Sequence, residues 1–298
     1  MIGPVWLASY PKSGNTWFRI ILANLSRDEP ADINTLRSAD WTAGNRAPFD
    51  AMLLIPSALL THDEADGLRP RVHEALVREA ADAASDGMAP SFVKVHDAYT
   101  LTPNGEPLLG GIAAGAILIV RDPRDVAPSI ASHSRTTIDQ AIAILNDRDG
   151  GICTGTRGVS QQFRQRLLDW SGHAASWIDQ RDIPVHVARY EDLLADPVHV
   201  FMAAMAFAGR PADLDQVRRA IGHSAFPALQ AQERASGFRE RPRPGDALGG
   251  PFFRQGQAGA WRDTLTETQV AAIEQAHGTM MRRLGYELSR PAGGGMGG

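Results

Sequence analysis

Four short apolar runs, separated by longer stretches with helical patterns, constrain the fold of this chain more than any other feature. Each run is continuous rather than alternating, which is typical of parallel strands that are buried on both faces. Their alternation with helices predicts an α/β fold, formed as a single three-layer domain whose central, mainly parallel sheet is flanked by helices. The four predicted strands are Ile2–Ser9, Ser91–Val95, Ala116–Val120 and Pro184–Ala188.

The stretches between the strands predict helices and loops. We expect residues 1–290 to form this one domain and residues 291–298 to be a flexible, glycine-rich tail. The segment 34–49 fits neither a helix nor a strand, and the segments 146–159 and 235–250 have the composition of loops that close over a substrate. The predicted helices are Thr16–Arg27, Glu64–Ala84, Asp125–His133, Gln161–Gln180, Val198–Ala208, Asp213–Gly222 and Glu267–Leu284.

Composition and charge exclude several classes of protein. With 298 residues, of which 43% are hydrophobic, the chain can bury a full core, unlike a disordered or collagen-like chain. The formal net charge of -4 disfavours whole-surface binding of nucleic acid, so an anion site has to be built locally. The single cysteine, Cys153, and the absence of a signal-peptide pattern favour the cytoplasm. The longest apolar run, Gly110–Val120, is too short for a membrane span.

Polar residues follow each predicted strand at once. In open α/β sheets, ligands bind beyond the carboxyl ends of the strands, so these residues are the first candidates for a functional site. The segments concerned are Tyr10–Trp17, His96–Thr100, Arg121–Ser129 and Arg189–Asp192.

The first of these segments contains PKSGNTW, which joins a strand to a helix and predicts an anion-binding loop. Backbone N–H groups at the start of a helix, with the positive end of the helix dipole, favour a phosphate, and Gly14 permits a close approach. The loop is P-loop-like but differs from the nucleotide-hydrolase motif, because Lys12 precedes the glycine. A capped turn with a surface lysine is the alternative, which the other polar segments disfavour.

The segment RDPRDVAPS follows the third predicted strand and begins a helix. Its Arg121 guanidinium and Ser129 hydroxyl can converge on one anion from the strand end and the first helical turns. By itself an Arg-Asp-Pro turn is more often an ion pair that caps a helix. Its pairing with the first loop favours the anion site.

Taken together, these motifs resemble the sulfotransferases of the cytosolic type, and the chain is identified as a bacterial member of that family. PKSGNTW is similar to the loop that binds the 5′-phosphosulfate, and RDPRDVAPS is similar to the 3′-phosphate segment. There are three further matches: KVHD at Lys94–Asp97, YED at Tyr190–Asp192 and FRQGQAGAWRDTLT near the C-terminus. All five motifs occur along the chain in the family's order.

The resemblance implies an enzyme that moves the sulfuryl group of 3′-phosphoadenosine 5′-phosphosulfate, by in-line transfer, to a hydroxyl or amine of a small-molecule or natural-product acceptor. It implies His96 as the general base, a role for which an imidazole is well suited near neutral pH. Lys12 would neutralise the leaving 5′-phosphate, with Lys94 close by. Lys12 would supply the charge that a metal supplies in phosphoryl transfer. Because a sulfuryl group carries less negative charge than a phosphoryl group, and no residues have metal-ligand spacing, no metal is expected.

The same resemblance implies which residues hold the donor. The 5′ end would lie on Lys12, Ser13, Gly14, Asn15 and Thr16. The 3′-phosphate would contact Arg121, Ser129, Arg254, Gln255 and Gly256. The nucleoside would lie against Trp17, Tyr190, Ser224 and Phe226.

The sequence departs from the family pattern at three places. Gln255 replaces a lysine, which removes one cation near the 3′-phosphate. Asp97 follows the histidine where animal members carry a hydrophobic residue, and predicts a more polar acceptor pocket. The usual dimerisation element retains mainly Thr266, so that mode of dimer formation is not expected and the oligomeric state stays open.

Two other functions stay open at this point, a kinase-like nucleotide-dependent phosphotransferase and a non-catalytic nucleotide-binding protein. The absence of G-K-[ST] disfavours the first, and the presence of both Lys12 and His96 disfavours the second. Ordinary surface, loop or core roles are expected of His62, His133, His223, Trp41, Trp170, Trp177 and Trp261.

Overall fold

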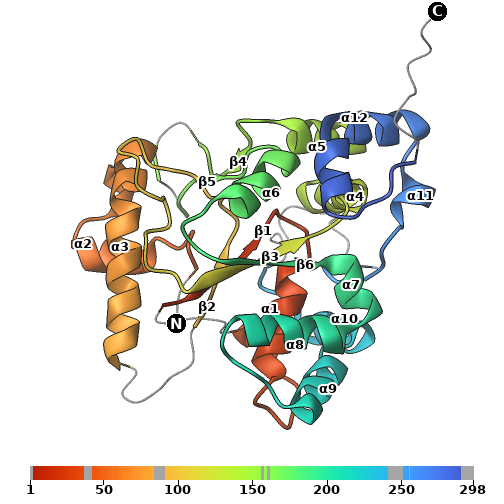
Figure 1. Ribbon diagram of the computed structural model, residues 1–298, viewed down its shortest axis with the longest axis horizontal. Coiled ribbons are helices and arrows are strands. Elements are labelled where there is room, and N and C mark those ends of the chain that lie inside the picture. Colours follow the sequence, from red (N-terminus) through yellow and green to blue (C-terminus); the bar gives the residue numbers. More distant parts are fainter. Residues whose placement is uncertain are drawn as a thin grey trace, which may run out of the picture.

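The computed structural model of the chain has a four-stranded parallel sheet at its centre (Figure 1). The strands β1 (Val5–Ser9), β2 (Phe92–Val95), β3 (Gly115–Val120) and β6 (Val185–Arg189) lie in the order β2-β1-β3-β6. All four predicted strands are confirmed, and only the predicted start at Ile2 lies outside the described part of the chain. The structure describes residues 3–36, 42–83, 91–155, 158–159, 162–240, 251–254 and 256–289.

Helices cover both faces of the sheet, which confirms the predicted three-layer α/β fold. They are α1 (Asn15–Asn24), α2 (Ala47–Leu53), α3 (His62–Ala83), α4 (Pro123–Ser134), α5 (Ile138–Asn146), α6 (Trp170–Asp179), α7 (Tyr190–Ala195), α8 (Pro197–Phe207), α9 (Leu214–His223), α10 (Phe226–Ser236), α11 (Trp261–Thr264) and α12 (Glu267–Arg283). In Figure 1, α4, α5, α6 and α12 lie above the sheet, α1, α8 and α9 lie below it, and α3 stands beside β2.

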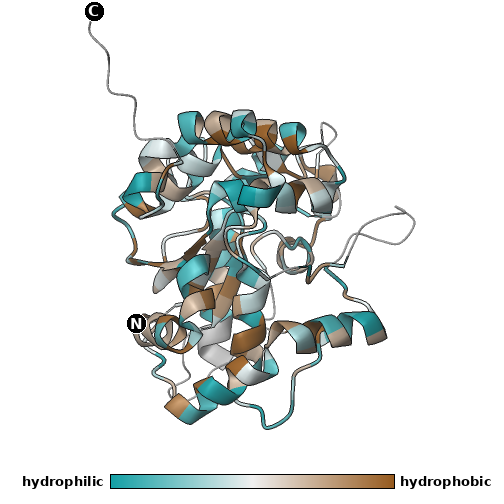
Figure 2. Ribbon diagram, turned by 90° about the vertical axis from the view of Figure 1, so that its right-hand side faces the viewer, coloured by the Kyte–Doolittle hydropathy of each residue, from teal (hydrophilic) through white to brown (hydrophobic). Residues whose placement is uncertain are grey.

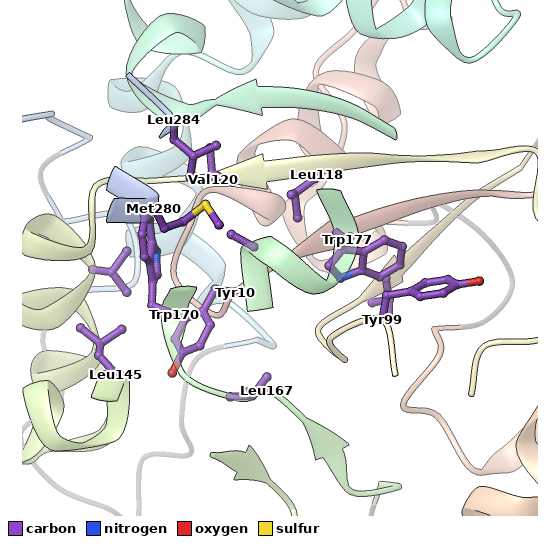
Figure 3. Packing of buried hydrophobic residues seen from close by; sticks show 14 of the residues in the cluster. Tyr10, Tyr99, Leu118, Val120, Leu145, Leu167, Trp170, Trp177, Met280 and Leu284 are labelled. Atoms are coloured by element: carbon purple, nitrogen blue, oxygen red, sulfur yellow. The ribbon is translucent and has the colours of Figure 1, made fainter. Parts of the chain in front are cut away.

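The alternating sides of the strands build one core on each face of the sheet. In β1, Trp6 and Ala8 pack in the cluster under α4, α6 and α12, whereas Val5 and Leu7 pack against α1, α8 and α9. Figure 3 shows the first cluster, where the buried tryptophan side chains of α6 lie close to the sheet. Figure 2 shows hydrophilic and hydrophobic residues alternating along the covering helices, as amphipathic packing requires. Within the described ranges, no helix is both long and apolar enough to cross a membrane.

One predicted helix, Gln161–Gln180, is wrong in its first half. Gln165–Arg166 forms β5 and pairs antiparallel with β4 (Gly151–Ile152). The backbone of Leu168 has a φ of 59°, which no α-helix accommodates, and α6 begins only after Asp169 caps it. A tertiary strand pair therefore overrides the helical pattern of this segment.

The sequence patterns missed the short helices α2, α5, α7, α10 and α11. A local signal was present for α5, because Thr137 and Gln140 form a capping box, in which each side chain accepts a hydrogen bond from the other residue's backbone N–H. None of the other four has a side-chain cap, although α2 and α10 carry a proline in the first turn, which is also a local start signal.

A buried ion pair joins α3 to the end of β2. Nη2 of Arg69 donates to Oδ2 of Asp97 at 2.8 Å, and both side chains are fully buried. The backbone N–H of Arg166 donates to the same carboxylate, so Asp97 also fixes β5. Asp97 therefore points into the protein interior, and the prediction that it makes the acceptor pocket more polar is wrong.

We predict that Asp97→Asn destabilises the protein by about 3 kcal/mol, because it leaves the buried Arg69 guanidinium without its main counter-charge. Urea unfolding followed by circular dichroism measures the effect. The control is Asp28→Asn, since that side chain is 95% exposed and should leave the unfolding midpoint unchanged. Equal midpoints for the two variants would show that the pair does not stabilise the fold.

Candidate active site

A cavity of about 700 Å³ opens at the carboxyl ends of β1, β2 and β3. All four segments that follow the predicted strands contribute to its wall. Among the residues proposed from the sequence, those that line it are Lys12, Gly14, Asn15, Thr16, Trp17, Lys94, His96, Arg121, Ser129, Tyr190, Phe226, Arg254 and Gly256. Ser13 and Ser224 are buried and do not line it. Gln255 lies outside the described residues.

The loop before α1 is fixed by its own side chains. Nδ2 of Asn15 donates to the Leu7 carbonyl at 2.9 Å and to the Ser9 hydroxyl at 3.2 Å, which ties the first turn of α1 to β1. Lys12 has a φ of 70° and Gly14 a φ of 102°, so the chain turns sharply before the helix starts. The helix N-terminus thereby faces the cavity, with the donors and dipole that favour an anion.

Gly14 is required at this place by its neighbour as well as by its backbone. A Cβ atom added there would come within 2.5 Å of Cδ2 of Tyr190. The Tyr190 ring is held in turn by the Arg121 guanidinium, 4.5 Å from its centroid, and by the edge of Trp17. The ring, the glycine and the anion loop therefore form one packed unit.

His96 leaves β2 with its imidazole held in one tautomer. Its Nδ1 lies 2.8 Å from the carbonyl oxygen of Ser9, which can only accept, so Nδ1 carries the proton. Nε2 is then the ring nitrogen that can take a proton. Burial, with a smaller contribution from the positive charge of Lys94, lowers the pKa of His96 to about 3. The imidazole is neutral at physiological pH and available as a base.

Cationic side chains gather around the loop. Burial and the positive charges of Arg121, Lys94 and Arg254 lower the pKa of Lys12 to about 8. Burial also lowers the pKa of Lys94, although Glu240 opposes that shift. Since these cations repel one another, the site favours an anionic ligand that removes the repulsion.

Arg121 links the loop before α1 to the C-terminal part of the chain. Its Nη1 donates to the Lys12 carbonyl at 3.3 Å, and its Nη2 donates to the Gln257 carbonyl at 3.1 Å. Within the described residues, its buried Nε has no hydrogen-bond partner, and neither has the buried hydroxyl of Ser13. Buried donors without acceptors are rare in proteins, and both of these lie beside the cluster of cations.

Two buried carboxylates place the C-terminal segment over the cavity. Asp125 of α4 accepts from the backbone N–H groups of Gly259, at 2.6 Å, and Trp261, at 2.9 Å. Glu233 of α10 accepts from the N–H groups of Phe252 and Phe253. Arg254 and Gly256 lie between these two anchors and so reach the cavity.

Aromatic side chains form the wall nearest to α9 and α10. Nε1 of Trp17 donates to the Ser224 carbonyl at 2.9 Å, which fixes the indole in the cavity. The Ser224 hydroxyl donates to the Ala220 carbonyl, so Ser224 contributes its backbone rather than its side chain to this arrangement. Phe226 packs against Gly256, whose φ of 56° and close contact leave no room for a Cβ.

The other end of the cavity is largely apolar. Tyr10, Ile130, Ile144, Ile152 and Leu167 line it, and the Tyr10 hydroxyl donates to the Ile144 carbonyl at 3.4 Å. Ile152 belongs to the segment 146–159, so the described part of that predicted substrate loop does reach the cavity.

Several residues of the wall were not predicted from the sequence. His133 was expected to have an ordinary role, but it lies one helical turn after Ser129 and lines the cavity. Phe252 lies under the Lys12 ammonium, with 4.2 Å from Nζ to the ring centroid. Glu240 also lines the cavity. It belongs to the predicted substrate loop 235–250, of which residues 241–250 lie outside the described residues, but it was not singled out as a site residue. In the described part of the chain, no three His, Cys, Asp or Glu side chains are grouped as metal ligands would be.

Comparison with known proteins points to one family. Residues 3–285 match the sulfotransferase domain family. The chain is 23% identical to human Sulfotransferase 2B1 over 287 residues, which cover 93% of this chain and 66% of that protein. It is 22% identical to the luciferin sulfotransferase of Photinus pyralis, over 90% of this chain and 69% of that protein. A shorter match, 26% identical to rat Sulfotransferase 2B1, covers 57% of this chain and 48% of that protein.

Two solved structures with a similar fold both hold the nucleotide PAP. Retinol dehydratase in complex with androsterone and the inactive cofactor PAP matches with a TM-score of 0.55 and 19% identity, over 97% of this chain and 82% of that chain. Mouse sulfotransferase SULT7A1 complexed with PAP matches with a TM-score of 0.54 and 15% identity, over 95% and 85% of the two chains. These likenesses show the fold.

We predict that Gly14→Ala destabilises the protein by about 1–3 kcal/mol, because the left-handed backbone is strained with a Cβ and Tyr190 has to move. Thermal unfolding gives the change. The control is Gly67→Ala within α3, where nothing lies within 4 Å of an added Cβ and stability should rise slightly. If Gly14→Ala were as stable as Gly67→Ala, the packed unit of loop and ring would be disproved.

Proposed function

The chain belongs to the sulfotransferase domain family, and from that premise we propose that it transfers the sulfuryl group of 3′-phosphoadenosine 5′-phosphosulfate to a hydroxyl or amine of a small molecule. The observation that carries the proposal is the meeting of two partly buried lysines and a neutral imidazole in one cavity. The lysines fit the leaving phosphate, and the imidazole fits the acceptor proton.

His96 acts as the general base in this proposal. Its Nε2 takes the proton of the acceptor hydroxyl while the acceptor oxygen forms its bond to sulfur and the bond from sulfur to the 5′-phosphate oxygen breaks. The hydrogen bond from Nδ1 to the Ser9 carbonyl keeps the ring in the required tautomer and stabilises the imidazolium that forms. The proton then leaves His96 for water, and the products are the sulfated acceptor and adenosine 3′,5′-bisphosphate.

Lys12, Lys94 and the start of α1 stabilise negative charge at the 5′ end of the donor. Lys12 is mostly protonated at neutral pH, since its pKa of about 8 lies above that range. The Thr16 hydroxyl and the backbone N–H groups of the loop lie beside these lysines, with Ser13 and Asn15 in the same turn. We call this set of groups, from Lys12, Lys94, Thr16 and the loop backbone, the anion cradle. Charge that develops on the leaving phosphate is thus met by groups already in place.

Arg121, Ser129 and Arg254 fit the 3′-phosphate, together with the backbone at Gln255 and Gly256. The buried Nε of Arg121 has no hydrogen-bond partner among the described residues, so it is a donor that a phosphate oxygen can satisfy. Trp17, Tyr190 and Phe226 offer aromatic faces and edges to the adenine. Of the nucleoside contacts expected from the sequence, Ser224 would act only through the carbonyl that holds Trp17.

The apolar end of the cavity fits a small acceptor with a largely apolar body. Solved structures of retinol dehydratase hold androsterone or retinol together with PAP, which agrees with such an acceptor. The single cysteine and a cytosolic relative from Arabidopsis thaliana agree with a cytoplasmic enzyme.

We predict that His96→Gln lowers the transfer rate by about 100- to 10,000-fold and leaves the affinity for adenosine 3′,5′-bisphosphate unchanged, because only the base is lost. Transfer is measured with sulfur-labelled donor and a panel of phenols, alcohols and amines, and affinity by calorimetry.

The pH dependence of the wild-type enzyme gives a second prediction. The wild-type kcat/KM should not fall between pH 7 and pH 5, since a His96 pKa of about 3 keeps the imidazole neutral over that range.

The matched control for the base is His199→Gln, in α8 and away from the residues that line the cavity. If both variants transferred the sulfuryl group at the wild-type rate, His96 would not be the general base. A wild-type protein that binds ATP with magnesium in preference to adenosine 3′,5′-bisphosphate would reject the proposed function itself.

A further inference from the structure

The carboxylate of Glu240 lies among donors that face the cavity. Its Oε2 accepts from the Thr16 hydroxyl at 3.1 Å and lies 3.5 Å from Nζ of Lys94. Its Oε1 accepts from Nη1 of Arg19 at 2.6 Å. An acidic side chain thus bridges the start of α1 and the end of β2, where the proposed donor would place its 5′ end.

Two anchors fix the backbone that carries this carboxylate. Phe238, two residues earlier, is buried in a cluster with Ile20 and Ile33. The backbone N–H of Arg239 donates to Oδ1 of Asn34 at 2.8 Å, and Nδ2 of Asn34 donates to the Gly237 carbonyl. The approach of Glu240 to the cradle is therefore built into the packing of this segment on α1.

The charge state of Glu240 matches its surroundings. Burial alone would favour the neutral acid, but the positive charges of Lys94 and Arg19 lower the pKa of Glu240 to about 2. The side chain is ionised at any physiological pH and offers the same chemistry to Thr16 and Lys94 as a phosphate or sulfate oxygen does.

We infer that Glu240 is an internal competing anion, whose carboxylate occupies the anion cradle at Thr16 and Lys94 and has to leave before a ligand anion enters. The identity of that ligand as the 5′ end of the sulfuryl donor rests on the function proposed above. The competition itself rests only on the contacts of the carboxylate.

The competition has a physical reason. Without an anion, the cations of the cradle repel one another, and Glu240 compensates that charge. The Thr16 hydroxyl has a single proton and cannot donate to two anions at once, and a ligand anion beside Lys94 would repel the carboxylate, so binding is coupled to the departure of the carboxylate. The glutamate side chain can leave by rotating about its own bonds, while Phe238 keeps its place. Apparent affinity is lowered by the fraction of molecules in which the carboxylate holds the cradle.

A different role for Glu240 leads to the opposite result. If the carboxylate stayed in place and oriented Lys94 toward the ligand, removing its charge would weaken binding. The sign of the change in affinity therefore separates the two roles.

The test compares Glu240→Gln with the wild type and with Glu29→Gln, an exposed residue whose substitution changes the net charge equally. Calorimetry measures binding of adenosine 3′,5′-bisphosphate and, separately, of pyrophosphate, which needs only the cradle. We expect Glu240→Gln to bind both ligands about tenfold more tightly than the other two proteins, since the neutral amide competes weakly. Equal or weaker binding of pyrophosphate by Glu240→Gln overturns the inference.

Two further comparisons keep the outcome decisive. Glu240→Ala should show the same gain, and if Glu240→Gln proved unstable in urea, Glu240→Ala would decide the question by the same criterion. Tighter pyrophosphate binding by the variant, with no binding of adenosine 3′,5′-bisphosphate by any of the proteins, would support the competition while rejecting the proposed function.

Discussion

Lys12, Lys94, Arg121 and Arg254 repel one another, and the other contacts of the site have to offset that repulsion. The formal net charge of the chain is -4, yet these four cations line one partly buried cavity. The cost is visible at Lys12, where burial and the three neighbouring cations lower the pKa to about 8. Such an arrangement is stable in a folded protein when backbone contacts hold the cations in place and an anion offsets their charge.

The carboxylates around the cavity are used in two different ways. Asp125 and Glu233 accept backbone N–H groups and so dock the C-terminal segment, without pairing with the cations of the cradle. Within the described residues, Lys12 and Arg254 form no ion pair with a carboxylate. Among the described carboxylates, only Glu240 contacts the cradle, through Lys94 and Thr16. It is therefore the carboxylate that competes with a ligand anion. The division keeps the charge of the site available for an anion.

Much of this arrangement could be predicted because its determinants are local. Continuous apolar runs identified the four strands, and PKSGNTW identified the turn at Gly14, because strand, loop and helix start follow each other directly in the chain. What failed depends on distant partners. Asp97 is buried because Arg69 lies opposite, Gln165 is in a strand because Gly151 and Ile152 pair with its segment, and Glu240 reaches the cradle because Phe238 packs on α1. No pattern within a short window encodes such contacts.

A crystal structure of the protein with adenosine 3′,5′-bisphosphate would show whether the cluster of cations is the nucleotide site. We expect the 5′-phosphate at the start of α1, in contact with Lys12 and Thr16, and the 3′-phosphate on Arg121 and Ser129. Nε2 of His96 should face the open space beside the 5′-phosphate. A nucleotide bound elsewhere, or held with its phosphates away from these cations, would contradict this expectation.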